Sequence, residues 1–159
     1  MPNFYCTREQ VKRAAEISGS NRDEEVDSLI EAASREIERL THTFFIPKTQ
    51  TRTFRWPPRQ SSESYVLWLD QWLLSVTTLQ TKAQDTSPTT ISSSDYFTEP
   101  NNPSVDGIQH FDRIEIDQSS TAAFEAGDTS QRSISVAGSW GYSNDTKSTG
   151  TVASGLDSD

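Results

Sequence analysis

The sequence predicts an α+β protein with an N-terminal helical pair (a hairpin), a following antiparallel β-rich lobe and a flexible polar C-terminal tail. One long stretch, residues 24–41, repeats its apolar residues with the spacing of an amphipathic helix. After Pro47 the apolar residues alternate and Thr and aromatic residues become frequent, which is typical of strands. The last residues are mostly Ser, Thr, Asn, Asp and Gly, which bury too little surface to fold alone. The expected domains are a helical region, a β-rich lobe and a polar tail or arm, at residues 1–47, 48–142 and 143–159.

The main helix is predicted over residues 23–41, and the rest of the chain is expected to be built onto it. Its apolar residues fall on one face that we expect to be buried, namely Val26, Leu29, Ile30, Ala33, Ile37 and Leu40. The opposite face is charged. A side-chain oxygen of Asn21 or Asp23 can cap its start by accepting from a free first-turn N–H group. Acids in the first turn and arginines near the end suit the helix dipole.

A shorter helix is predicted before it. Thr7 and Gln10 match a capping box, in which each side chain bonds to the main chain of the other residue. The helix should run to about Ile17, with Val11, Ala14 and Ala15 facing inward. Two helices joined by a short link are expected to pack against each other.

The β-rich lobe should contain short strands separated by polar or proline-containing turns. The expected strands cover residues 49–56, 65–69, 73–81, 96–97, 111–116 and 132–137. The polar pair Asp70-Gln71 is expected to separate the second strand from the third, and residues 138–142 are typical of a compact turn. The residues expected to face inward from the last two strands are Ile114, Ile116, Ile134 and Val136.

Composition narrows the functional classes. The 159 residues carry a net charge of −9, which argues against electrostatic capture of nucleic acid by Lys and Arg. No run approaches the roughly 20 apolar residues that span a bilayer, and the first residues do not resemble a signal peptide. The single cysteine excludes an internal disulfide framework. We therefore expect a soluble protein of a reducing compartment without membrane contact.

No set of residues indicates an enzyme, a cofactor or a metal site. His42 and His110 are far apart, and neither has a second His or a Cys at metal-ligand spacing. Cys6 has no surrounding motif of a nucleophile, so a hydrolase that uses Cys6 or an acid pair ranks last. No glycine-rich phosphate loop is present.

The four tryptophans leave a second function open. Trp68 and Trp140 are expected to fill the sheet core or to pin a turn, whereas Trp72, beside the polar break, is expected at a partner-facing edge. Aromatic residues on β surfaces also bind sugars or proteins. The alternative function is therefore a β-sandwich binding module for a carbohydrate or a host receptor, using Trp56, Trp68 or Trp72.

The order of the motifs resembles the head–tail connector proteins of tailed bacteriophages, also called adaptor or head-completion proteins. The matching segments lie at residues 5–7, 37–41, 44–47, 73–79, 95–97 and 134–142. Together they cover residues 4–142 in the order of the family. Family members continue after the Trp-Gly-Tyr segment into a C-terminal helix, whereas the present chain stays polar to Asp159.

The resemblance implies a structural virion protein of the neck, made in the cytoplasm of a bacterial host. Such proteins form a ring, expected to be dodecameric, below the portal protein. The ring extends the DNA channel and docks the stopper or the tail-completion protein, and DNA passes without specific binding. No enzymatic activity or cofactor is implied.

Within such a ring, the acidic face of the main helix could line the channel or face outward to solvent, and the residues favour neither. The channel-facing candidates are Glu24, Asp27, Glu31 and Glu38. The candidates for a partner interface are Arg35, Arg39, Trp72, Val152 and Leu156. The last two belong to the tail, which we expect to act as an arm that binds the portal or a neighbouring copy.

Overall fold

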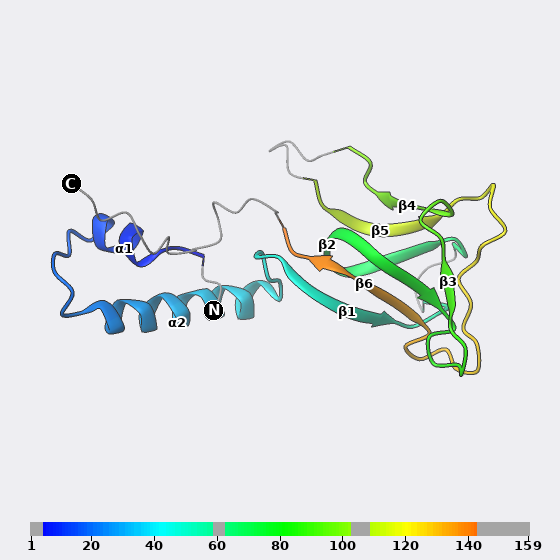
Figure 1. Ribbon diagram of the computed structural model, residues 1–159, viewed down its shortest axis with the longest axis horizontal. Helices are drawn as coiled ribbons and strands as arrows, with labels where there is room; N and C mark the ends of the chain where they lie inside the picture. Colours follow the sequence, from blue (N-terminus) through cyan, green and yellow to red (C-terminus); the bar gives the residue numbers. More distant parts are fainter. Residues whose placement is uncertain (1–4, 59–62, 103–108, 143–159) are drawn as a thin grey trace. The chain divides into compact units, whose positions relative to one another are not determined.

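The computed structural model describes residues 5–58, 63–102 and 109–142 (Figure 1). Within these ranges the chain forms two helices followed by one six-stranded antiparallel sheet, which confirms the predicted α+β class. The helices are α1 (Arg8–Ala14) and α2 (Asp23–Thr41). The strands are β1 (Lys48–Phe54), β2 (Val66–Thr81), β3 (Thr89–Ile91), β4 (Tyr96–Glu99), β5 (Phe111–Ile116) and β6 (Ile134–Trp140). The chain divides into two compact units, a helical unit that ends at Ile46 and a sheet unit that begins at Pro47.

Helix α1 begins at the predicted capping box. Thr7 Oγ1 accepts from the Gln10 main-chain N–H at 3.1 Å, and Gln10 Oε1 accepts from the Thr7 N–H at 2.8 Å. The helix ends at Ala14, earlier than predicted, because Glu16 takes a left-handed conformation with φ of 54°. Ala14 and Ala15 are exposed, so their predicted burial is wrong, whereas Val11 is half-buried.

Helix α2 has the predicted extent but not the predicted cap. Its N-cap residue is Arg22, which makes no side-chain capping bond, so the prediction of Asn21 or Asp23 as the cap is wrong. The Asp23 carboxylate instead accepts from Arg8 and Lys12 of α1. The helix ends where His42 adopts a left-handed conformation with φ of 52°.

The central strand of the sheet is β2, in the order β1-β6-β2-β5-β4, with β3 also paired to β2. It merges the two strands that were expected on either side of Asp70-Gln71, so the predicted break is wrong. The pairing of β2 with β5 instead shifts register between Trp68 and Leu73. A bulge of this kind takes up extra residues without ending the strand. Gln71 lies within it and is buried.

Strand β6 continues through Gly138 to Trp140, where a turn was predicted. The glycine in this segment suggested a turn, but Gly138 lies within the strand, where β6 and β2 approach each other closely. A Cβ atom at this position would lie 2.1 Å from the Ser75 carbonyl oxygen. Trp140 is fully buried, as expected for a core residue, and its Nε1 donates to the Gln50 carbonyl oxygen at 3.1 Å.

The core of the sheet unit is apolar and includes the four inward residues that alternation predicted. The buried apolar residues of β2, β5 and β6 are Val66, Leu67, Leu73, Leu74, Leu79, Ile114, Ile116, Ile134, Val136 and Trp140. Outside the strands, Trp56 is also buried and packs on Phe124, with ring centroids 4.8 Å apart. Strand β3 was not predicted.

Candidate interaction site

The apolar face of α2 is only partly covered. Val26 and Ile30 are each 5% exposed, as predicted. The other large apolar residues of this face contradict the prediction of burial, because Leu29, Ile37 and Leu40 are 63%, 42% and 66% exposed. Ala33 is exposed as well. The seven residues of α1 are too few to cover a helix of 19 residues, which is why the face divides.

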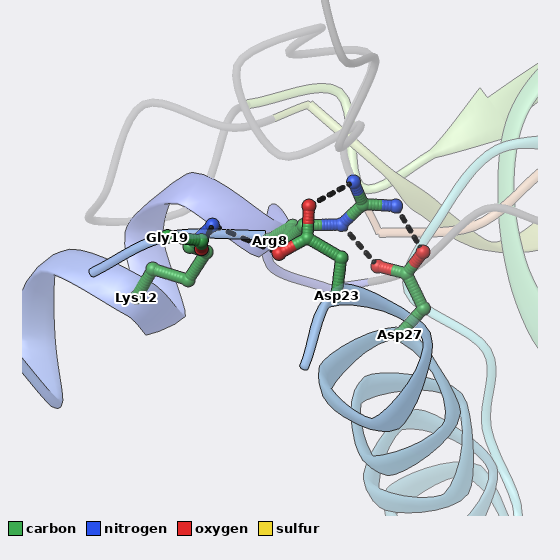
Figure 2. Close-up of polar contacts among 5 residues, drawn as sticks. All are labelled: Arg8, Lys12, Gly19, Asp23 and Asp27. Carbon is green, nitrogen blue, oxygen red and sulfur yellow. Dashed lines mark hydrogen bonds and ion pairs between the residues drawn. The ribbon is translucent and has the colours of Figure 1, made fainter. Parts of the chain in front are cut away.

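Ion pairs hold α1 on the first two turns of α2. Figure 2 shows the Arg8 guanidinium between Asp23 and Asp27, with Nη1 3.1 Å from Asp23 Oδ2 and Nε 2.8 Å from Asp27 Oδ1. Arg8 Nη2 also pairs with the second oxygen of Asp27. Lys12 Nζ donates to Asp23 Oδ1 at 2.8 Å and to the Gly19 carbonyl oxygen at 2.6 Å. Helix α1 is therefore fixed at the N-terminal end of α2.

These contacts hold the two carboxylates in the charged form. The hydrogen bond from Lys12 lowers the pKa of Asp23, and the bonds from Arg8 do the same for the pKa of Asp27. The acidic start of α2 is thus partly neutralised by α1.

Tyr5 covers a second part of α2. Its main-chain N–H donates to Ser34 Oγ at 3.4 Å, and its hydroxyl donates to Glu38 Oε1 at 3.1 Å. The same hydroxyl accepts from the Phe45 N–H at 3.2 Å, and burial raises the pKa of Tyr5. The segment before α1 therefore covers the Ser34 side of the helix and leaves the neighbouring side open.

The open side forms an apolar stripe, defined here as Leu29, Ala33, Ile37 and Leu40. Residues three or four positions apart lie next to each other on a helix, so the four side chains form one continuous surface. Two exposed ion pairs flank it, Arg22 with Glu25 at 3.9 Å and Arg39 with Glu36 at 2.8 Å. A contiguous exposed apolar surface of this kind is typical of an interaction site.

The four predicted channel-facing acids have different surroundings. Glu24 and Glu31 are exposed, and neither carboxylate makes a hydrogen bond or a close ion pair with another residue that the structure describes, although the charge of Glu31 acts on Arg35. Asp27 pairs with Arg8, and Glu38 accepts from Tyr5 and from Arg35 Nη1 at 2.7 Å. Two of the four acids, Glu24 and Glu31, therefore present exposed carboxylates on the outside of the helix.

The predicted partner-interface residues are mostly engaged within their own unit. Arg35 pairs with Glu38, and Arg39 pairs with Glu36. Trp72 is half-buried and packs with the rings of His110 and Tyr142, whose centroids lie 4.7 and 4.6 Å away. Val152 and Leu156 lie outside the described residues.

A second exposed surface lies on the sheet. The sequence named its Trp68 only as an alternative binding residue and did not single out its Phe97. Trp68, expected in the core, is 53% exposed, and Phe97 is 55% exposed. The Arg113 guanidinium lies 5.3 Å from the centre of the Trp68 ring, and its Nε donates to Glu115 at 2.7 Å. The alternation of β2 could have indicated that Trp68 points away from the buried Leu67.

Neither known proteins nor the described residues point to a specific chemistry. In the part of the chain that the structure describes, no three His, Cys, Asp or Glu side chains could hold a metal ion. Neither α1 nor α2 is long and apolar enough to cross a membrane. Comparison with protein-family models, curated proteins and solved structures finds no match to this chain. The function must therefore be inferred from the chain's own residues.

Proposed function

We propose that this protein is a head–tail adaptor of a tailed bacteriophage. Its copies form a ring below the portal protein, extend the DNA channel, and dock the stopper or tail. The observation that carries the proposal is the apolar stripe on α2, whose large side chains are 42–66% exposed in the single chain. Covering them with another chain removes apolar surface from water, which favours association.

A ring needs a surface of this kind on every copy. Each copy of a closed ring contacts its neighbours head to tail, through two different faces of the same molecule. The stripe supplies one such face, next to a side of α2 that α1 and Tyr5 already cover. The motif order that resembles the connector family supports the same assignment.

The two exposed acids of α2 fit the passage of DNA. Glu24 and Glu31 are seven residues apart, so they lie on one side of the helix, away from Leu29 and Leu40. In the proposed ring the stripe faces the neighbouring copy, and these carboxylates face the channel. Their charge repels the phosphates of the DNA and keeps it from binding to the wall.

The mass of the purified protein, alone and mixed with a portal ring, tests the proposal. Light scattering with negative-stain imaging should show a ring, or a collar on the portal. The double variant Leu29→Glu with Leu40→Glu should lose this assembly, because charges replace the apolar contact. Ser28→Glu, an exposed polar position on the same helix, is the matched control and should assemble normally. A monomer that ignores the portal would remove the adaptor function.

The exposed aromatic surface of the sheet favours a second candidate function. Strand pairing sets Trp68 opposite Arg113 and Phe97 opposite Glu115, so all four side chains share one face of the sheet. Aromatic rings beside charged hydrogen-bonding groups suit a carbohydrate or a host receptor. A monomer that binds glycans, and that loses the binding in Trp68→Ala, would support this function over the adaptor.

A further inference from the structure

Strand β1 forms one long edge of the sheet, and no other strand of the described residues pairs with its outer side. It is the terminal strand in the order β1-β6-β2-β5-β4 (Figure 1). All seven of its residues pair with β6 without a register shift, from Lys48 opposite Trp140 to Phe54 opposite Ile134. The strand is therefore regular along its whole length.

The pairing of β6 shows which main-chain groups of β1 point outward. The Gly141 N–H donates to the Trp72 carbonyl at 2.9 Å, and the Ser133 carbonyl accepts from Ala83 at 2.8 Å. The odd-numbered residues of β6 therefore face β2, and the even-numbered residues face β1. In an antiparallel ladder the paired residues that exchange hydrogen bonds alternate with those that do not.

The outward groups belong to three threonines. The partners of the even-numbered β6 residues, which bond to β6, are Lys48, Gln50, Arg52 and Phe54. The N–H and C=O groups of Thr49, Thr51 and Thr53 consequently point away from the sheet. Their side chains are exposed, and no hydrogen bond links these outward groups to another residue of the described ranges.

This edge carries Lys48 and Arg52 but lacks several other features that ordinarily protect a sheet. Exposed edges are usually short, bulged, covered, or interrupted by Pro or inward-pointing charge. The opposite edge, β4, follows that rule, because it has four residues and Pro100 follows it directly. Strand β1 has no proline and no bulge, and Arg52 is paired with Asp70, with Nε 2.9 Å from Oδ1.

We propose that β1 pairs antiparallel with β1 of a second copy of this chain, with Thr51 opposite Thr51. This register sets Thr49 opposite Thr53 of the other copy, so every outward N–H and C=O of the three threonines has a partner. A shift by two residues in either direction leaves a threonine of each copy without a partner.

The side chains suit this register. Facing threonines form favourable cross-strand pairs on the exposed side. On the other side Arg52 lies opposite Gln50 and Lys48 lies opposite Phe54, so no like charges face each other. The contact is self-complementary, as a two-fold dimer requires.

The pairing goes beyond the adaptor function. A two-fold contact makes the two ends of the dimer identical, whereas an adaptor joins two different partners at its ends. The β1 pair therefore belongs to the free protein and opens when a copy enters the neck. It protects an edge that would otherwise pair with unrelated chains.

Single-cysteine cross-linking tests the register in a Cys6→Ser background. Opposed residues of a hydrogen-bonded pair have Cα atoms about 5.5 Å apart, within the range of a disulfide. Thr51→Cys should therefore form a disulfide-linked dimer on mild oxidation. Thr49→Cys is the matched control and should not, because its copies lie four residues apart along the strand, about 13 Å. A mixture of the Thr49→Cys and Thr53→Cys proteins should link again.

Sedimentation of the free protein tests the same contact without cysteines. Thr51→Pro removes an outward N–H that β6 does not use, so the sheet should keep its tryptophan fluorescence while the dimer dissociates. Thr51→Val keeps the N–H and should remain dimeric.

Other results of these experiments would contradict the β1 pairing. Equal cross-linking of Thr49→Cys and Thr51→Cys, or a monomeric wild-type protein, would overturn the pairing. Equal masses for the free wild-type and Thr51→Pro proteins would also overturn it, whereas a portal collar formed by both proteins would leave the adaptor function supported. If Thr51→Pro does not fold, the cross-linking result decides.

Discussion

Arg8 connects the two helices through a pair of carboxylates. Its guanidinium bonds to Asp23 and Asp27, and Lys12 adds a second bond to Asp23. Because the pKa values of both carboxyls are lowered in the folded chain, their pairing stabilises the fold above the ordinary carboxyl pKa. That contribution is lost as the pH falls through the lowered values.

Acid should therefore release α1 from α2 before it unfolds the sheet. On titration from about pH 7 to about pH 2, we expect the helical circular dichroism to fall only below the ordinary carboxyl pKa of about 4, as the pH drops through the lowered pKa values of Asp23 and Asp27. Tryptophan fluorescence gives an internal control, since all four tryptophans belong to the sheet unit. Arg8→Gln should weaken the helical signal at neutral pH and flatten its acid transition. Simultaneous loss of both signals in the wild-type protein would contradict this account.

The extent of the main helix was predicted better than the burial of its side chains. Periodicity gave the extent of α2 because the spacing of Val26, Ile30 and Ile37 depends on helix geometry alone. Which side chains are buried depends on what packs there, and the short α1 leaves Ile37 exposed. In the sheet, the polar Asp70-Gln71 pair indicated a break because a bulge inside a strand has no local sequence signal.

Two neighbouring residues of α2 differ in burial, since Ile30 lies on the buried face and Leu29 lies on the apolar stripe. Ile30→Ala should lower the free energy of unfolding of the helical unit by about 2–5 kcal/mol, because it leaves a cavity on the buried side of α2. Leu29→Ala removes a similar side chain from an exposed position, so the change should stay within about 0.5 kcal/mol. Denaturant unfolding followed by circular dichroism measures both. Equal losses would show that the stripe is already covered in the free protein.

At the scale of the molecule, the sequence was sufficient for the fold class and insufficient for the interaction site. Helical spacing before Pro47 and alternation after it separate the two structural classes along the chain. The stripe and the β1 edge could not be predicted in the same way. Both surfaces depend on which other elements pack against the helix or strand, and only the folded chain shows this. Leu40 and Thr51, for example, are exposed because no described element covers them.

The charge of the whole assembly should affect DNA transit if the chain is an adaptor. Glu24→Lys with Glu31→Lys would turn a repelling wall into an attracting one, so phage particles that carry it should eject DNA more slowly. Added salt should reduce the difference, because it screens the new attraction. Glu9→Lys with Glu16→Lys makes the same change in net charge on exposed positions outside α2 and serves as the control. Unchanged ejection would place the acidic side of α2 outside the channel.

The position of β6 inside the sheet sets the order in which the chain can fold during synthesis. Strand β1 has β6 as its neighbour in the sheet, and Lys48 meets Trp140, which the ribosome adds 92 residues later (140 − 48). The two helices, complete by Thr41, need no such delay. Because distant pairing is slow, the sheet closes last and nearly all at once. A chain that terminates before Ile134 would keep its helices but expose both edges of β1, and nascent or truncated copies are therefore the form most prone to aggregate.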